Sequence, residues 1–158
     1  IQPWINEEDW EYDARCAAEG TALVYTNAVL SLRRLFLDGD HLSSHSSSNP
    51  LKLSHRALAQ QSIFQCALKA GVTLAAPEMK RFSRSAFLLS RQCAEAGLEN
   101  EAVSLHHLAC SACERDCVPF DLRLYAWLAR QVGWQRAALT SKLLRRIMAI
   151  PARLQRSS

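Results

Sequence analysis

The sequence predicts a mainly α-helical fold, a helical bundle or paired helical hairpins, preceded by one helix and two short strands. The first observation behind this prediction is the placement of proline and glycine: beyond residue 50, prolines precede and glycines follow segments with helical spacing of apolar residues. The second is that no strand-like alternation follows residue 35. The third is a pattern that recurs at an offset of 36 residues, from Gly97 to Gly133. An apolar content of 49% is enough to form a core.

The first third of the chain carries all the predicted strand content. A helix is expected over residues 8–19, because Gly20 follows as a C-terminal stop. Two short strands are expected after it, at residues 21–26 and 29–35. A Ser-rich loop then leads to Pro50. We place a domain boundary in this loop, which divides the chain into residues 1–48 and 49–158.

Everything after the loop is predicted to be helical. The expected helices are bounded by glycine or proline at one end or both, and they cover residues 53–70, 78–96, 100–115, 121–132 and 135–150. Aligning Gly97 on Gly133 reveals an internal repeat, with pairs Leu88–Leu124, Leu89–Tyr125, Cys93–Ala129 and Ala102–Ala138. The offset is similar to the repeat length of tetratricopeptide (TPR) proteins, which is about 34 residues. TPR-like hairpins are therefore one prediction and a generic helical bundle is the other.

The N-terminal stretch carries a motif. Three consecutive acids, Glu7-Glu8-Asp9, lie between Trp4 and Trp10 and precede Arg15 and Gly20. This order of residues resembles the Glu-Asp motif late in the catalytic domain of family 2 glycosyltransferases, which have the GT-A fold. The resemblance implies that residues 1–48 are the end of a GT-A α/β domain. It also implies that the nucleotide-binding strands and the metal-binding Asp-x-Asp of the family precede residue 1.

The same resemblance assigns site residues. It implies that Asp9 is the general base, with Glu8 beside it, and that Arg33, Arg34 and His41 contact the diphosphate of a nucleotide-sugar. His41 is also a candidate ligand of Mg²⁺ or Mn²⁺, although the principal ligands are expected outside the chain. The acceptor would be a glycan, a lipid-linked group or a protein, and the fragment alone would be inactive. The simpler alternative is that these acids only start a helix, whose dipole they complement.

A group of His and Cys residues in the second half suggests a metal site at first sight. His106, His107, Cys110, Cys113 and Cys117 are close in sequence, but zinc sites usually join two ligand pairs from separate elements. Spacings of three and four instead predict one face of a helix, on which Cys acts as a small buried hydrophobe. We expect all six cysteines to be reduced thiols, because no secretory signal is visible.

The charge and hydropathy of the chain restrict which kinds of partner it is expected to bind. The net charge is +4, and the basic residues lack an aromatic-interleaved groove, so no nucleic-acid partner is predicted. No apolar run reaches the length of a membrane span. The protein is expected in the cytoplasm, with peripheral contact to the inner membrane face through the last helix as an option. Trp127 and Trp134 are expected in the core. The alternative function is a non-catalytic helical-repeat module that binds another protein.

Overall fold

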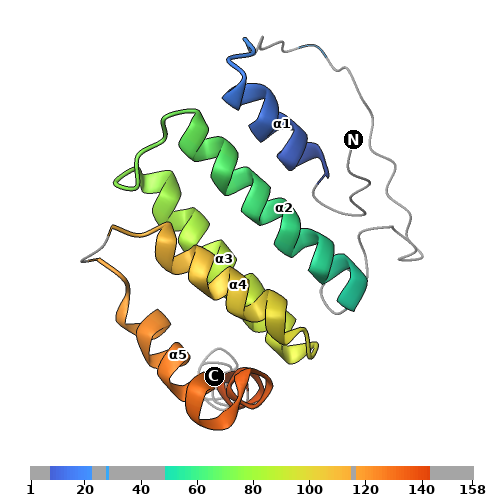
Figure 1. Ribbon diagram of the computed structural model, residues 1–158, viewed down its shortest axis with the longest axis vertical. Coiled ribbons are helices and arrows are strands. Elements are labelled where there is room, and N and C mark those ends of the chain that lie inside the picture. The colour runs from blue at the N-terminus through green and yellow to red at the C-terminus, as the bar shows by residue number, and fades with distance from the viewer. Residues whose placement is uncertain (1–7, 23–27, 29–48, 115–116, 143–158) are drawn as a thin grey trace, which may run out of the picture. The chain divides into compact units, whose positions relative to one another are not determined.

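The computed structural model describes residues 8–22, 28, 49–114 and 117–142 (Figure 1). These residues contain helices and no strand, which confirms the predicted mainly α class for this part of the chain. Most of the two predicted strands, at 21–26 and 29–35, lies outside the described residues, whereas Thr21 and Ala22 are described and have no regular structure. The helices are α1 Glu8–Ala18, α2 Pro50–Lys69, α3 Pro77–Glu95, α4 Glu99–Ser111 and α5 Phe120–Val132, and residues 134–142 are also helical.

The chain divides into two compact units, Ile1–Thr73 and Leu74–Ser158. The first unit contains α1 and α2, and the second contains α3, α4 and α5. The predicted domain boundary after residue 48 lies outside the described residues and stays a prediction.

In the first unit, α1 packs against α2. The Oγ of Ser62 donates a hydrogen bond of 2.9 Å to Glu11, and Lys69 forms an ion pair with Glu19. Helix α2 begins at a side-chain cap, in which Oδ1 of Asn49 accepts the backbone N–H of Leu51 at 3.0 Å. The sequence-based start of this helix, at residue 53, is too late because an Asn-Pro pair is typical of loops as well as of helix starts.

In the second unit, α3 and α4 form a hairpin that turns at Gly97 (Figure 1). The backbone N–H of Leu98 donates to the carbonyl of Cys93 at 2.9 Å, and that of Gly97 to Ala94 at 3.1 Å. This pair of bonds is a Schellman motif, which needs a left-handed residue, and Gly97 has φ +79°. The prediction that this helix ends at Gly97 is therefore confirmed, and the positive φ of Gly97 explains why a glycine ends it.

Small residues and serine hydroxyls hold the two helices of this hairpin together. Ser90 Oγ donates to the carbonyl oxygen of Ala102, and Ser83 Oγ to that of Ala109, each at 2.7 Å. These bonds satisfy buried hydroxyls and the backbone of the facing helix at once. Leu105, which is fully buried, lies on α4 between Ala102 and Ala109, on the helix face that receives these bonds.

The internal repeat seen in the sequence has a counterpart in burial. The pairs match at an offset of 36 residues: Leu88 and Leu124 are both exposed, and the other three pairs are buried, namely Leu89–Tyr125, Cys93–Ala129 and Ala102–Ala138. At these four pairs, burial in α5 and in the helical residues 134–142 matches burial in α3 and α4, whereas Phe87, Arg91 and Ala94 are buried and their counterparts at the same offset, Arg123, Trp127 and Arg130, are exposed.

The end of α4 differs from the prediction. The expected helix over residues 100–115 stops at Ser111, with Ala112 as its cap. Neither glycine nor proline marks this end in the sequence, and the chain must instead turn before Pro119, which caps α5. Cys113 and Cys117 therefore lie beyond the helix, so the prediction that they share a helical face with Cys110 is wrong.

Candidate functional site

The predicted catalytic acids lie at the start of α1. Glu8 is the first residue of this helix, and Asp9 follows it with an exposed side chain. No other described residue forms an ion pair or hydrogen bond with the Asp9 carboxylate. The helix ends where the motif predicts, since Gly20 has φ +76° and donates its N–H to Ala17 at 3.0 Å.

Glu11 is an acid of the same helix in a different environment. It is only 6% exposed, and it accepts hydrogen bonds from Arg15 at 3.2 Å and from Ser62 at 2.9 Å. Because these bonds occupy its carboxylate, Glu11 fixes α1 on α2. Asp9 is the acid of the two that a solute can reach.

The other residues that the sequence predicts for this site cannot be placed beside Asp9. Arg33, Arg34 and His41 all lie outside the described residues. Their assignment to the diphosphate, and that of His41 to a metal ion, remain predictions.

The second unit holds a groove that sequence reasoning missed. It has a volume of about 470 Å³ and is bounded by α4, α5 and Trp134. Successive turns of the two helices supply its walls, with Val103, His106, His107 and Cys110 from α4 and with Arg123, Ala126, Trp127 and Arg130 from α5. Trp127 is 59% exposed, so the expectation that it belongs to the core is wrong.

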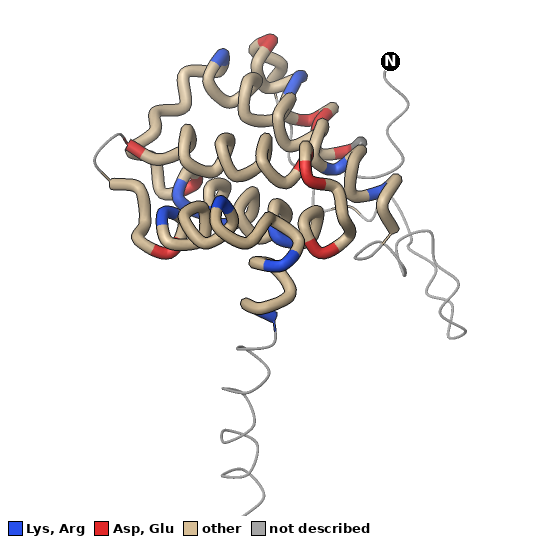
Figure 2. The backbone as a smooth tube through the Cα atoms, turned by 60° about the horizontal axis from the view of Figure 1, so that its bottom comes forward, with Lys and Arg blue, Asp and Glu red and all other residues tan. Residues whose placement is uncertain are grey.

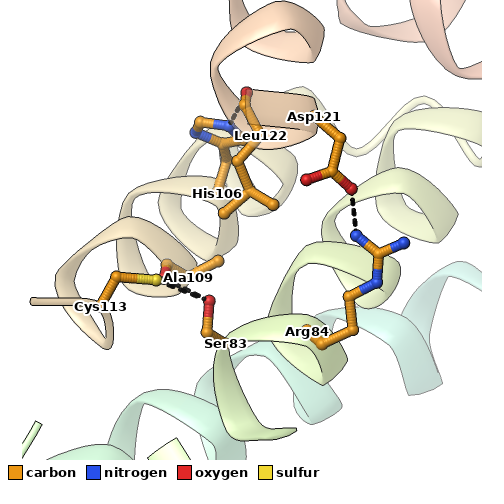
Figure 3. Close-up of polar contacts among 7 residues, drawn as sticks. All are labelled: Ser83, Arg84, His106, Ala109, Cys113, Asp121 and Leu122. Carbon is orange, nitrogen blue, oxygen red and sulfur yellow. Dashed lines mark hydrogen bonds and ion pairs between the residues drawn. The ribbon is translucent and has the colours of Figure 1, made fainter. Parts of the chain in front are cut away.

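His106 is the buried polar residue of this groove. It is 5% exposed, and its Nε2 donates to the carbonyl oxygen of Leu122 at 3.0 Å, as Figure 3 shows. Its ring stacks on Tyr125 at 6.5 Å and meets Trp134 edge-on at 5.3 Å. These contacts tie α4 to α5 and to the segment after it, so His106 fixes the shape of the groove.

A thiol lies next to the same imidazole. Cys110 Sγ is 3.8 Å from Nδ1 of His106, the nitrogen that the Leu122 bond leaves as an acceptor. Burial raises the pKa of the Cys110 thiol, and Cys113 raises it further. Burial lowers the pKa of His106 and outweighs the hydrogen bond to the Leu122 carbonyl, which raises this pKa. Both residues are thus held in their neutral forms, the opposite of the thiolate–imidazolium pair of a cysteine nucleophile.

The rim of the groove is cationic. Arg123, Arg130 and His107 are exposed, and no acid lines the groove. Arg84 and Asp121 form an ion pair beside it (Figure 3), whereas no described residue is an ion-pair partner of Arg123 or Arg130. Basic and acidic residues are otherwise interspersed along the helices (Figure 2).

The buried imidazole predicts a pH dependence of stability. Because burial lowers the pKa of His106 in the folded state, its stabilising contribution is complete above the unfolded value of about 6.5 and is lost as the pH falls below it. His107 and Arg130 act in the same direction through their charge. Urea unfolding between pH 7.5 and about 5, followed by circular dichroism, should show a smaller loss in His106→Gln than in the wild type.

His107→Gln is the matched control, because His107 is the next residue on the helix and is exposed. It should keep most of the pH dependence of the wild type, because burial, the main cause of the lowered pKa of His106, is unchanged in this variant. The slope that one proton contributes cannot exceed about 1.4 kcal/mol per pH unit. Equal slopes for His106→Gln and the wild type would contradict the assignment.

No group of three or more His, Cys, Asp or Glu residues that could hold a metal ion occurs in the described part of the chain. All six cysteines are free thiols. None of the described helices is both long and apolar enough to cross a membrane.

Comparison of the chain with known protein families, with curated proteins and with solved structures gives no match.

Proposed function

We propose that the chain is the C-terminal part of a family 2-like glycosyltransferase, which transfers a sugar from a nucleotide-sugar to a glycan, a lipid-linked acceptor or a protein. The observation that carries this proposal is the exposed Asp9 in the first turn of α1. It stands in the order Glu8, Asp9, Trp10, Arg15 and Gly20 of the motif that the sequence resembles. The hydrogen bond from Ser62 of α2 to Glu11 holds this helix and leaves Asp9 open to an acceptor.

The chemistry needs one carboxylate at this position. As the acceptor oxygen attacks the anomeric carbon, its proton passes to Asp9, and the bond from that carbon to the diphosphate breaks with its electron pair on the leaving group. A bound Mg²⁺ or Mn²⁺ would stabilise the leaving diphosphate. The described residues offer no cluster for this ion, and its ligands are expected upstream. Six free thiols agree with a reducing compartment, and we place the enzyme in the cytoplasm.

The test is a transfer assay on a longer protein that includes the upstream residues. It should release nucleoside diphosphate from at least one nucleotide-sugar when an acceptor is present, and it should bind that donor without the acceptor. Failure to bind any of the common nucleotide-sugars would contradict the proposal.

A second function is favoured by the second unit, namely a helical-repeat module that binds another protein. The matching burial of three residue pairs across Gly97 and Gly133 supports a repeated hairpin of TPR type. The groove between α4 and α5 provides a docking surface with a large exposed aromatic residue, Trp127. This function is compatible with transfer by another part of the enzyme.

The module is tested by selecting binders from a random peptide library displayed on phage, with the whole chain as bait. Wild-type protein should enrich peptides that Trp127→Ala no longer retains, because an exposed aromatic residue in a groove is a typical binding hot spot. Enrichment of no peptide, or of peptides that bind the variant equally well, would contradict an interaction function of this groove.

A further inference from the structure

One face of α5 presents a cation, an aromatic ring and a second cation in sequence. Arg123, Trp127 and Arg130 are all exposed and all line the groove. The two arginines are seven residues apart, so they lie two helical turns or about 10.5 Å apart along the axis. Trp127 lies between them, one turn from each. A ligand that contacts all three must therefore carry three groups in the same order.

The hollow behind this ridge is apolar. Val103 and Ala126 line it from the two helices, and Trp134 lies beside them. His106 adds no charge, because burial lowers its pKa. A volume of about 470 Å³ is sufficient for one large apolar side chain. The surface thus combines an apolar pocket with two flanking cations.

The charges of the neighbouring residues indicate the sign of the partner. Two acids of this unit have ion-pair partners: Asp121 pairs with Arg84, and Glu95 pairs with Lys142. Arg123 and Arg130 have none among the described residues, and no carboxylate lines the groove. The field in the groove is therefore positive, and an acidic partner complements it. Two guanidiniums with interspersed acids elsewhere are too few for the continuous basic track of a nucleic-acid surface.

We propose that the α4/α5 groove binds an acidic amphipathic helix of a partner protein, with two carboxylates two turns apart and one large apolar residue between them. The carboxylates pair with Arg123 and Arg130, and the apolar residue enters the hollow beside Trp127. A helix with groups at positions i, i+3 or i+4, and i+7 presents them on one face, which matches the spacing on α5. This proposal rests on the interaction function of the second unit, and it adds the class of the partner.

The test uses labelled helix-forming peptides in which Glu, Leu and Glu occupy positions i, i+4 and i+7 of an Ala- and Gln-rich host. Fluorescence anisotropy measures their affinity for the whole chain at low and physiological salt. Replacing both Glu by Gln, or Leu by Ala, should weaken binding at least about tenfold. A peptide with the second Glu at i+5, on the opposite face, should lose a similar factor.

Charge reversal of the protein provides the specific readout. The double variant Arg123→Glu/Arg130→Glu should bind the Glu peptide at least about tenfold more weakly and should bind a Lys/Lys peptide more tightly than the wild type does. Arg81→Glu is the matched control, because Arg81 is exposed on α3 and does not line the groove. It should change the affinity by less than about twofold.

Three outcomes of these binding measurements would overturn the proposal. The first is equal binding of the Glu and Gln peptides, and the second is an unchanged affinity in the charge-reversed variant. The third is tighter binding of a single-stranded oligonucleotide than of the acidic peptide, with loss in the same variant. If the phage selection yields groove-dependent peptides without acids, only the class of the partner is wrong. If it yields none, the interaction function fails as well.

Discussion

Asp9→Asn, in the longer protein that the proposed glycosyltransferase function requires, is expected to lower turnover by about 10²- to 10⁴-fold, the range that general-base catalysis contributes. Asparagine has nearly the same shape, but it cannot accept the proton of the acceptor hydroxyl. Nucleotide-sugar affinity should stay nearly unchanged, because this proton transfer belongs to the transition state rather than to donor binding. Steady-state rates of diphosphate release, together with donor binding by calorimetry, measure the two quantities.

Asp13→Asn is the control for this experiment. Asp13 lies one turn further along α1 and is exposed, so its replacement by Asn removes the same charge at a position outside the motif. Its turnover should stay within about twofold of the wild type. Glu11→Gln should instead lower stability, because the Glu11 carboxylate is buried and bonded to Ser62. An Asp9→Asn enzyme that retains more than about a tenth of the wild-type turnover would exclude Asp9 as the base.

Leu105→Ala is expected to have the largest effect on stability. The Leu105 side chain is fully buried at the interface of α3 and α4, where its removal leaves a cavity. Substitutions of this kind cost about 2–5 kcal/mol, depending on how far the neighbours collapse. Urea unfolding of the whole chain, followed by circular dichroism, should show a lower midpoint for the transition of the second unit.

Leu124→Ala serves as its control, since Leu124 is 49% exposed on α5. Its free energy of unfolding should change by no more than about 0.5 kcal/mol. A loss below about 1 kcal/mol in Leu105→Ala would mean that the α3/α4 interface does not form the core of this unit.

The ends of the helices were predictable to the extent that the backbone itself demands a particular residue. A Schellman stop needs positive φ, so Gly20, Gly71 and Gly97 mark the ends of α1, α2 and α3 in the sequence. The end of α4 carries no such residue and was misplaced, because the turn after Ser111 is set by the path of the chain to Pro119. The strands expected at 21–26 and 29–35 stay untested for the most part, since they lie largely outside the described residues.

The two candidate sites differ in what the sequence could reveal. Asp9 is found from a local motif, because its neighbours in the chain carry the resemblance. The groove depends on which faces of α4 and α5 stay uncovered, and that is decided by packing between residues far apart in sequence. A large aromatic residue such as Trp127 is therefore assigned to the core by default. The spacing of Arg123, Trp127 and Arg130 is the signal that could have indicated an exposed ridge.

The turn between α3 and α4 has a consequence for chemical synthesis. A side chain added at Gly97 would meet nothing closer than Gln135, at 3.8 Å, so space does not explain why glycine is needed. The requirement is one of chirality, because φ +79° is unfavourable for an L-amino acid and natural for its mirror image. D-Alanine, introduced at Gly97 by peptide ligation, would match this backbone and restrict the unfolded chain more than glycine does. Ribosomal synthesis, which is limited to glycine and L-residues, therefore leaves a gain in stability of about 0.4–1 kcal/mol unused at this turn.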